Sequence, residues 1–111
     1  MPRASAYRDA AQNFRRTSAR LTDLALANRS LDATAIGAVG PIGAQHDANL
    51  ADVGRDVATV ADELLRLADV CERRAQVCDE YARRLTEYWT APISDRVGSV
   101  PPAPPARWAS A

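Results

Sequence analysis

The stretch that decides the fold runs from Leu50 to Trp89 and reads LADVGRDVATVADELLRLADVCERRAQVCDEYARRLTEYW. It contains no proline and a single glycine, Gly54. Along it, positions at alternating steps of three and four residues are almost all apolar, thiol or aromatic, and Arg74 is the one charged exception. This is the heptad pattern of a helix that packs along another helix. The row consists of Leu50, Val53, Val57, Val60, Leu64, Leu67, Cys71, Arg74, Cys78, Tyr81, Leu85 and Tyr88.

The same stretch predicts a helix over residues 46–91. Asp47 is a suitable N-cap, and Pro92 cannot continue a helix. Acidic residues precede arginines by four positions on the outer faces, and each such pair stabilises a helix by about 0.2–0.5 kcal/mol. These pairs are Asp62–Arg66, Asp69–Arg73, Asp79–Arg83 and Glu80–Arg84.

A shorter amphipathic helix is predicted upstream, over residues 5–29, with Ser5 as its N-cap. Its apolar row is Tyr7, Ala10, Phe14, Thr17, Leu21, Leu24 and Asn28. Between the two helices, residues 30–45 hold Gly37, Gly40, Pro41 and Gly43, a density of helix breakers that indicates a turn. Within that turn, residues 32–36 are expected to form a single helical turn.

The predicted fold is therefore an all-α antiparallel helical hairpin over residues 1–91, followed by a flexible proline-rich tail over residues 92–111. The first helix is too short to cover all of the second, so the row from Cys78 to Tyr88 is expected to need a partner outside the chain. Pairing of two hairpins would give a four-helix bundle. A bend of the second helix near Arg73 and Arg74 is the alternative. The predicted partner interface is Leu64, Leu67, Cys71, Cys78, Tyr81, Leu85, Tyr88 and Trp89.

Composition excludes several functions. Basic and acidic residues balance, 14 against 14, so a nucleic-acid partner is not expected. No apolar run has the length of a membrane span, and none near the N-terminus resembles a signal peptide. The only histidine, His46, lacks a converging nucleophile, and no phosphate-binding loop or metal-ligand cluster is present. We therefore expect no enzymatic activity, no cofactor, no metal and no small-molecule substrate.

The two cysteines, Cys71 and Cys78, are seven residues apart. On a helix their Cα atoms would be about 10 Å apart, which is too far for a disulfide within the helix. The favoured interpretation is that both are small core residues. A disulfide between two chains is the alternative.

The short first helix, the turn Gly37-Ala38-Val39-Gly40-Pro41-Ile42-Gly43, the stretch from Leu64 to Tyr81 and the Tyr/Trp cluster resemble one known family. They look like the WXG-type (ESX) small helical-hairpin proteins of actinobacterial type VII secretion systems, in a form with Gly-Pro in place of Trp-x-Gly. All 14 basic residues are arginine, which fits a GC-rich bacterial source. The family's Tyr-x-x-x-Asp/Glu signal is absent, because Leu85 follows Tyr81 and Pro92 follows Tyr88 at that spacing.

The resemblance implies the signal-less member of a hairpin pair, either a homodimer or a heterodimer. It also implies export by a route that needs no signal peptide, or a cytoplasmic stage before export. The alternative hypotheses are a self-associating coiled-coil scaffold unrelated to secretion and a small DNA-binding regulator. The balanced charge argues against the regulator.

Overall fold

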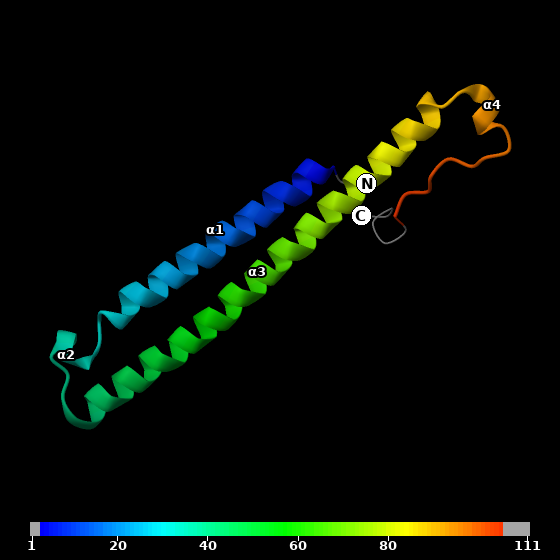
Figure 1. Ribbon diagram of the computed structural model, residues 1–111. Coiled ribbons are helices and arrows are strands. Elements are labelled where there is room, and N and C mark those ends of the chain that lie inside the picture. The colour runs from blue at the N-terminus through cyan, green and yellow to red at the C-terminus, as the bar shows by residue number, and fades with distance from the viewer. Residues whose placement is uncertain (1–2, 106–111) are drawn as a thin grey trace. The chain divides into compact units, whose positions relative to one another are not determined.

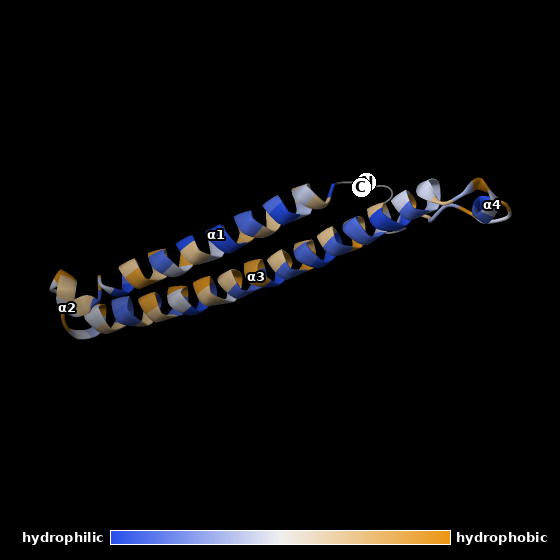
Figure 2. Cartoon of the chain, turned by 45° about the horizontal axis from the view of Figure 1, so that its top comes forward, coloured by the Kyte–Doolittle hydropathy of each residue, from blue (hydrophilic) through white to orange (hydrophobic). Residues whose placement is uncertain are grey.

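The computed structural model describes residues 3–105, and within this range it contains four helices and no strand. Helix α1 spans Ala4–Arg29, α2 spans Ala33–Ile36, α3 spans Gly40–Thr90 and α4 spans Ile93–Arg96 (Figure 1). Hydrophobic and hydrophilic positions alternate along both long helices, as amphipathic helices require (Figure 2). The predicted all-α class is confirmed.

The chain divides into two compact units that share the long helices. The turn unit comprises residues 12–68, and the terminal unit comprises residues 1–11 together with residues 69–111. Because each unit has its own internal contacts, each is described by itself.

In the turn unit, α1 and α3 run antiparallel and are joined through α2, which makes a helical hairpin (Figure 1). The two long helices meet through small side chains. Ser18 of α1 and Ala61 of α3 are 4% and 5% exposed, and the Ser18 hydroxyl donates a 3.0 Å hydrogen bond to the Ala61 carbonyl oxygen. Contact between a side chain on one helix and the backbone of the other requires a short interaxial distance, which only small residues permit.

The α3 positions that face α1 are not all those expected from the heptad row. The least exposed column runs through Gly54, Ala61 and Ala68, whereas Val53 and Val60 are 45% and 50% exposed. Val53 and Val60 therefore lie away from the contact with the first helix, contrary to the prediction for the heptad row, whereas the row members Leu50, Val57, Leu64, Leu67 and Cys71 are half-buried. Alanine and glycine allow the backbones to approach more closely than valine and leucine would, so the helix turns its small column inward.

The turn between the helices is shorter than predicted, because α3 begins at Gly40 and not at residue 46. Pro41 lies in the first turn of α3, where a missing N–H costs nothing and the fixed φ suits a helix. Gly37 ends α2 with a positive φ of 73°, a conformation that glycine adopts without strain. The predicted single turn over residues 32–36 is confirmed by α2.

Two aspartates and the histidine fix the turn. Asp32 caps α2 by accepting a 2.9 Å hydrogen bond from the Ala35 N–H. Asp47 lies inside α3 and accepts a 2.8 Å hydrogen bond from the Ala33 N–H, so it caps α2 from the neighbouring helix and is not the N-cap of its own. His46 Nε2 donates to the Leu31 carbonyl oxygen at 2.6 Å.

Ser5, which was predicted to be the N-cap of the first helix, lies within the first turn of α1.

In the terminal unit, the first residues of α1 lie beside the middle of α3. Arg8 forms an ion pair with Asp79, and Ala11, Ala75 and Cys78 are buried. Helix α3 ends at Thr90, close to the predicted end before Pro92. After the short helix α4, the chain reverses and runs back along α3 (Figure 1). The row from Cys78 to Tyr88 therefore does have neighbours within the chain, contrary to the prediction.

Candidate interaction surface

The described residues bury only small side chains. The largest of those below a tenth exposed is Cys78, and the others are alanine, serine and glycine. No leucine, valine, isoleucine, phenylalanine, tyrosine or tryptophan in residues 3–105 is fully buried. A hydrophobic side chain contributes its full free energy of burial, about 1.5–3 kcal/mol, only when it leaves water completely. Some bulky side chains, such as Phe14, Leu64 and Leu67, are half-buried, and others, such as Leu24, Val53 and Val60, are exposed.

In the turn unit, these bulky side chains gather on one flank of the hairpin, which we call the Val60 face. Val60 precedes the buried Ala61 by one residue, which places it about 100° around α3 from the contact with α1. Residues three and four positions away lie beside it on the same side of the helix. The Val60 face consists of the exposed residues Thr17, Leu24, Val53 and Val60 and the half-buried residues Phe14, Leu21, Leu64 and Leu67.

A groove on the other flank shows which columns of the two helices lie together. Thr22, Leu26 and Arg29 of α1 line it together with Gly54, Val57 and Ala58 of α3. The column of α1 through Leu24 and the column of α3 through Val60 both point away from this groove. They consequently lie together on the flank opposite to it. Leu24 is 61% exposed and Val60 is 50% exposed, so the Val60 face is open to solvent.

The groove side of the hairpin, which we call the Leu65 face, is chemically different. Leu65 is 45% exposed, close to the value for Val60, but Arg15 and Arg29 lie on the same side of α1. An apolar side chain between guanidinium groups is a poor anchor for an apolar partner, because docking would remove those charges from water. The Val60 face has no charged member and is the better candidate for an interface.

Charged residues of opposite sign border the Val60 face on its two helices. Arg20 lies three and four positions from Thr17 and Leu24 on α1. Asp56 and Glu63 take the same place beside Val60 on α3. The α1 rim is therefore positive and the α3 rim is negative, so a second hairpin that laid its own α1 along this α3 would place opposite charges together.

The predicted interface residues fall into two groups. Leu64 and Leu67 are half-buried members of the Val60 face. The other six lie in the terminal unit. There Cys78 is 4% exposed and is enclosed by its own chain, so it is not available as a partner contact in this structure. Cys71, Tyr81, Leu85 and Tyr88 are half-buried, and Trp89 is 58% exposed.

The aromatic cluster at the end of α3 contacts the chain that follows it. The Tyr88 and Trp89 rings meet edge to face at 5.1 Å between centroids, and the Arg96 guanidinium lies 5.6 Å from the Trp89 ring centroid. The Tyr88 hydroxyl donates a 3.3 Å hydrogen bond to the Ser99 carbonyl oxygen. These contacts hold the residues after α4 against the end of α3.

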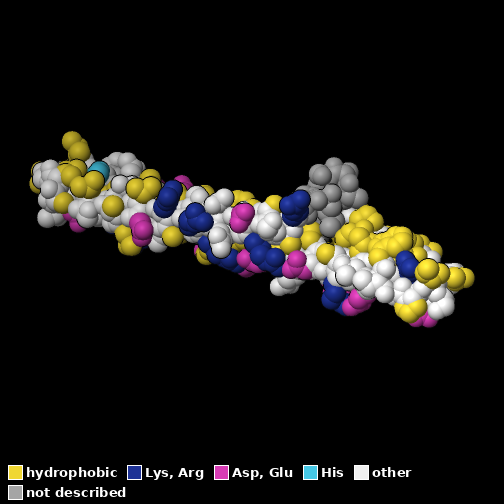
Figure 3. Space-filling view, turned by 90° about the horizontal axis from the view of Figure 1, so that it is seen from above, with side chains coloured by type: hydrophobic (Ala, Val, Ile, Leu, Met, Phe, Trp, Pro, Cys, Tyr) yellow, Lys and Arg dark blue, Asp and Glu magenta, His cyan; other side chains and the backbone are white. Residues whose placement is uncertain are grey.

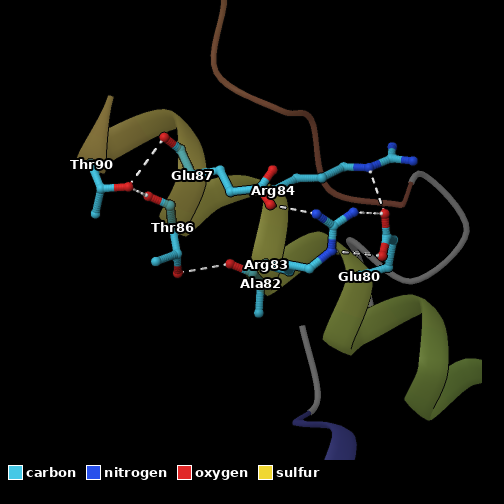
Figure 4. Close-up of polar contacts among 7 residues, drawn as sticks. All are labelled: Glu80, Ala82, Arg83, Arg84, Thr86, Glu87 and Thr90. Carbon is cyan, nitrogen blue, oxygen red and sulfur yellow. Dashed lines mark hydrogen bonds and ion pairs between the residues drawn. The ribbon is translucent and has the colours of Figure 1, made fainter. Parts of the chain in front are cut away.

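An arginine–glutamate network covers the outer side of α3 near its end (Figure 4). Arg83 donates to Glu80 at 3.1 Å from Nε and also pairs with Glu87. Arg84 Nε donates to Glu80 at 3.0 Å, which confirms the predicted Glu80–Arg84 pair. The hydrogen bonds from Arg83, with a smaller contribution from Arg84, lower the pKa of Glu80 below its ordinary value. This network is a solvated helix face and contains no arrangement suited to acid–base catalysis.

In two of the other predicted pairs, Arg66 and Asp79 have different partners. Arg66 donates to Glu63, three residues before it, at 3.0 Å from Nε, and this hydrogen bond lowers the pKa of Glu63. Asp79, expected to pair with Arg83, instead meets Arg8 of α1. Exposed pairs of this kind contribute little to stability, so the exchange of partners has small energetic consequences.

A second apolar cluster lies at the turn and was not predicted. Ile36 is 52% exposed, Val39 is 82% exposed and Ile42 is 77% exposed. In Figure 3, hydrophobic side chains gather around the single histidine on the face that is shown. Glycine and proline marked this segment as a turn, and that signal conveys no information on which turn residues stay exposed.

The small columns are the functional feature that the sequence prediction missed. They repeat every seven residues on both helices, as Ala4, Ala11, Ser18 and Ala25 on α1 and as Gly54, Ala61, Ala68 and Ala75 on α3. A search for seven-residue repeats of small residues would have found them. The prediction instead favoured bulky apolar residues, which are the usual occupants of a heptad seam.

In residues 3–105, no three histidine, cysteine, aspartate or glutamate side chains lie close enough to hold a metal ion, and Cys71 and Cys78 form no disulfide with each other. In the same range no helix has the apolar length needed to cross a bilayer. The tail residue Trp108 and its neighbours at positions 106–111 lie outside the described residues.

Comparison of this chain with protein-family models, with curated proteins and with solved structures finds no match.

Proposed function

We propose that this chain is a non-enzymatic interaction protein whose Val60 face pairs with a second helical hairpin to form a four-helix bundle. One observation carries the proposal: the hairpin contact fully buries only small side chains, and one flank keeps Leu24, Val53 and Val60 exposed beside half-buried apolar neighbours. A contiguous apolar flank of this kind is typical of a protein–protein interface.

The partner that fits this surface is another pair of amphipathic helices. The Val60 face is two helices wide, and its α3 column repeats every seven residues through Val53, Val60 and Leu67. A seven-residue repeat packs best against helices with the same repeat. Arg20 at the α1 rim is positive, and Asp56 and Glu63 at the α3 rim are negative. These charges favour a partner whose α1-like helix lies along this α3 and whose α3-like helix lies along this α1. A second copy of this chain meets both requirements.

The biological setting that we propose is a type VII (ESX)-like secretion system. The support is the resemblance of the hairpin, its Gly-Pro turn and its Tyr/Trp cluster to the WXG-type proteins. In that setting the chain would be the signal-less member of a pair. Genes for a secretion ATPase or for a second small hairpin protein beside its gene would favour this role over a coiled-coil scaffold unrelated to secretion.

Two matched variants test the proposed interface. Val60→Asp places a carboxylate in the centre of the Val60 face, and Leu65→Asp places one at a similarly exposed site on the Leu65 face. Both changes remove one aliphatic side chain from α3, so they affect the isolated helix alike. Sedimentation equilibrium of the chain alone, and pull-down with co-expressed neighbouring hairpin proteins, measure association.

We expect Val60→Asp to weaken association at least about tenfold, because a buried unpaired carboxylate costs more than the about 1.4 kcal/mol that a tenfold change represents. Leu65→Asp should leave association within about twofold, as expected for a surface change outside the interface. Equal effects of the two variants would rule out the Val60 face as the interface. A chain that remains monomeric and captures no hairpin partner would rule out the function.

A further inference from the structure

The residues after α4 follow a defined path along α3 within the terminal unit. The Ser99 carbonyl oxygen accepts a hydrogen bond from the Tyr88 hydroxyl. The Ser99 N–H and the Ser99 hydroxyl donate hydrogen bonds to the Arg96 carbonyl oxygen, at 3.1 Å and 2.9 Å respectively. Arg96 in turn lies against the Trp89 ring. The chain is therefore fastened to the end of α3 immediately before the proline-rich segment at residues 101–105.

In the proline-rich segment the two half-buried residues, Pro102 and Pro105, are three positions apart. They line a groove with α3 together with the exposed Ala103, whereas Pro101 and Pro104 are exposed and do not line it. The segment has no helical or strand hydrogen bonding. A polyproline II helix has three residues per turn and no internal hydrogen bonds, so residues 102 and 105 fall on one side of it and residues 101 and 104 on another.

The α3 surface under these two prolines has an apolar centre and polar edges. Val77 and Tyr81 supply the apolar part, and Arg73, Gln76, Glu80 and Arg84 surround them. Aromatic side chains with polar neighbours are what proline-rich segments use as docking surfaces, because the stiff polyproline II helix loses little conformational entropy on binding. Glu80 and Arg84 hold each other at 3.0 Å, which keeps the edge of the groove in place.

The geometry points to a polyproline-binding surface on α3 around Tyr81, occupied in cis by residues 101–105 of the same chain. This surface is separate from the Val60 face and belongs to the other unit. The tail is a ligand of its own helix.

Two matched variants of the full chain test the inference. Pro102→Ser with Pro105→Ser removes the two inward prolines, and Pro101→Ser with Pro104→Ser removes the two outward ones. Both variants make the same chemical change at the same distance along the tail, and far-UV circular dichroism should show equal helix content. With ¹³C-labelled tyrosine, nuclear Overhauser effects between the Tyr81 ring and prolyl protons report docking directly.

We expect Tyr81–proline Overhauser effects in the natural chain and in the outward variant, and their loss in the inward variant. A synthetic peptide with the sequence of residues 97–105, VGSVPPAPP, then serves as the probe. It should shift the Tyr81 resonances of the inward variant saturably, with a dissociation constant several-fold below about 1 mM, the effective concentration of a short tethered segment. The natural chain should need several-fold more peptide, because its own tail competes.

Three results would overturn the inference. They are the absence of Tyr81–proline Overhauser effects in the natural chain, equal behaviour of the two variants, and no saturable shift of the inward variant by the peptide. None of these measurements requires a partner hairpin, so their outcome is independent of whether the Val60 face binds one.

Discussion

Replacement of Ala61 by leucine tests the small-residue contact on which the hairpin depends. Ala61 is 5% exposed, and the Ser18 hydroxyl lies 3.0 Å from its carbonyl oxygen. Leucine adds three carbon atoms at a point where the two helices already touch. The helices must therefore move apart or the new side chain must adopt a strained rotamer, and such overpacking costs about 1–3 kcal/mol.

Separation of the helices has a second cost. Ser18 is 4% exposed, and its hydroxyl would lose the Ala61 carbonyl oxygen as its acceptor. An unsatisfied buried hydroxyl costs about 1–3 kcal/mol. Some burial of leucine surface offsets these losses, so we expect a net destabilisation of about 2 kcal/mol. For a domain of this size that corresponds to a fall in Tm of about 8–16 °C.

Thermal and urea denaturation followed by circular dichroism at 222 nm measures the effect. The matched control is Ala51→Leu, because Ala51 is exposed on the same helix and leucine is nearly as good a helix former as alanine. The control should change stability by less than about 0.5 kcal/mol. Both variants must be compared at several protein concentrations, since association would add to the stability of each. If Ala61→Leu is as stable as Ala51→Leu, the small-residue contact does not hold the helices together.

Three further changes have defined outcomes. Asp47→Ala removes the cap on the Ala33 N–H and should destabilise by about 0.5–2 kcal/mol, with faster hydrogen exchange in α2, whereas the exposed Asp56→Ala should leave that exchange unchanged. Gly37→Ala forces a side chain into a positive φ of 73° and should cost about 1–2 kcal/mol in urea denaturation. The pKa of Glu80 is lowered in the folded chain, so its contribution to stability is present above the ordinary value of 4.5 and is lost as the pH falls through the lower folded value. Thermal melts between about pH 2 and pH 6 should show a shallower acid destabilisation for Glu80→Gln than for the natural chain; identical profiles would contradict this assignment.

Much of the hairpin could be predicted from local sequence signals. The apolar periodicity located both long helices, and the glycines between Gly37 and Gly43 located the turn. Helix ends were less accurate, because Asp47 and Ser5 resemble N-caps in sequence but lie inside their helices. Cap residues are defined by backbone geometry, which the residue type alone does not specify.

The partner interface stays a prediction. Within the chain, Leu64 and Leu67 are half-buried, Cys78 is buried and Tyr81 lines a groove together with the tail. The prediction treated the tail as free, because a proline-rich composition defines an extended backbone without indicating where it docks. The three-residue spacing of the half-buried Pro102 and Pro105 became visible only when the segment was placed beside α3.

The sequence by itself determined that the chain forms two amphipathic helices around a glycine-rich turn, because helix formation depends on local propensity and on the spacing of apolar residues. The apolar spacing favoured the bulky row that includes Val53 and Val60 as the inner face of α3, and it did not single out the small column through Gly54, Ala61 and Ala68. The tertiary structure decided in favour of the small column. The reason is that the closeness of two backbones is a property of both helices together, and the small residues of α1 and α3 permit an approach that neither helix specifies alone.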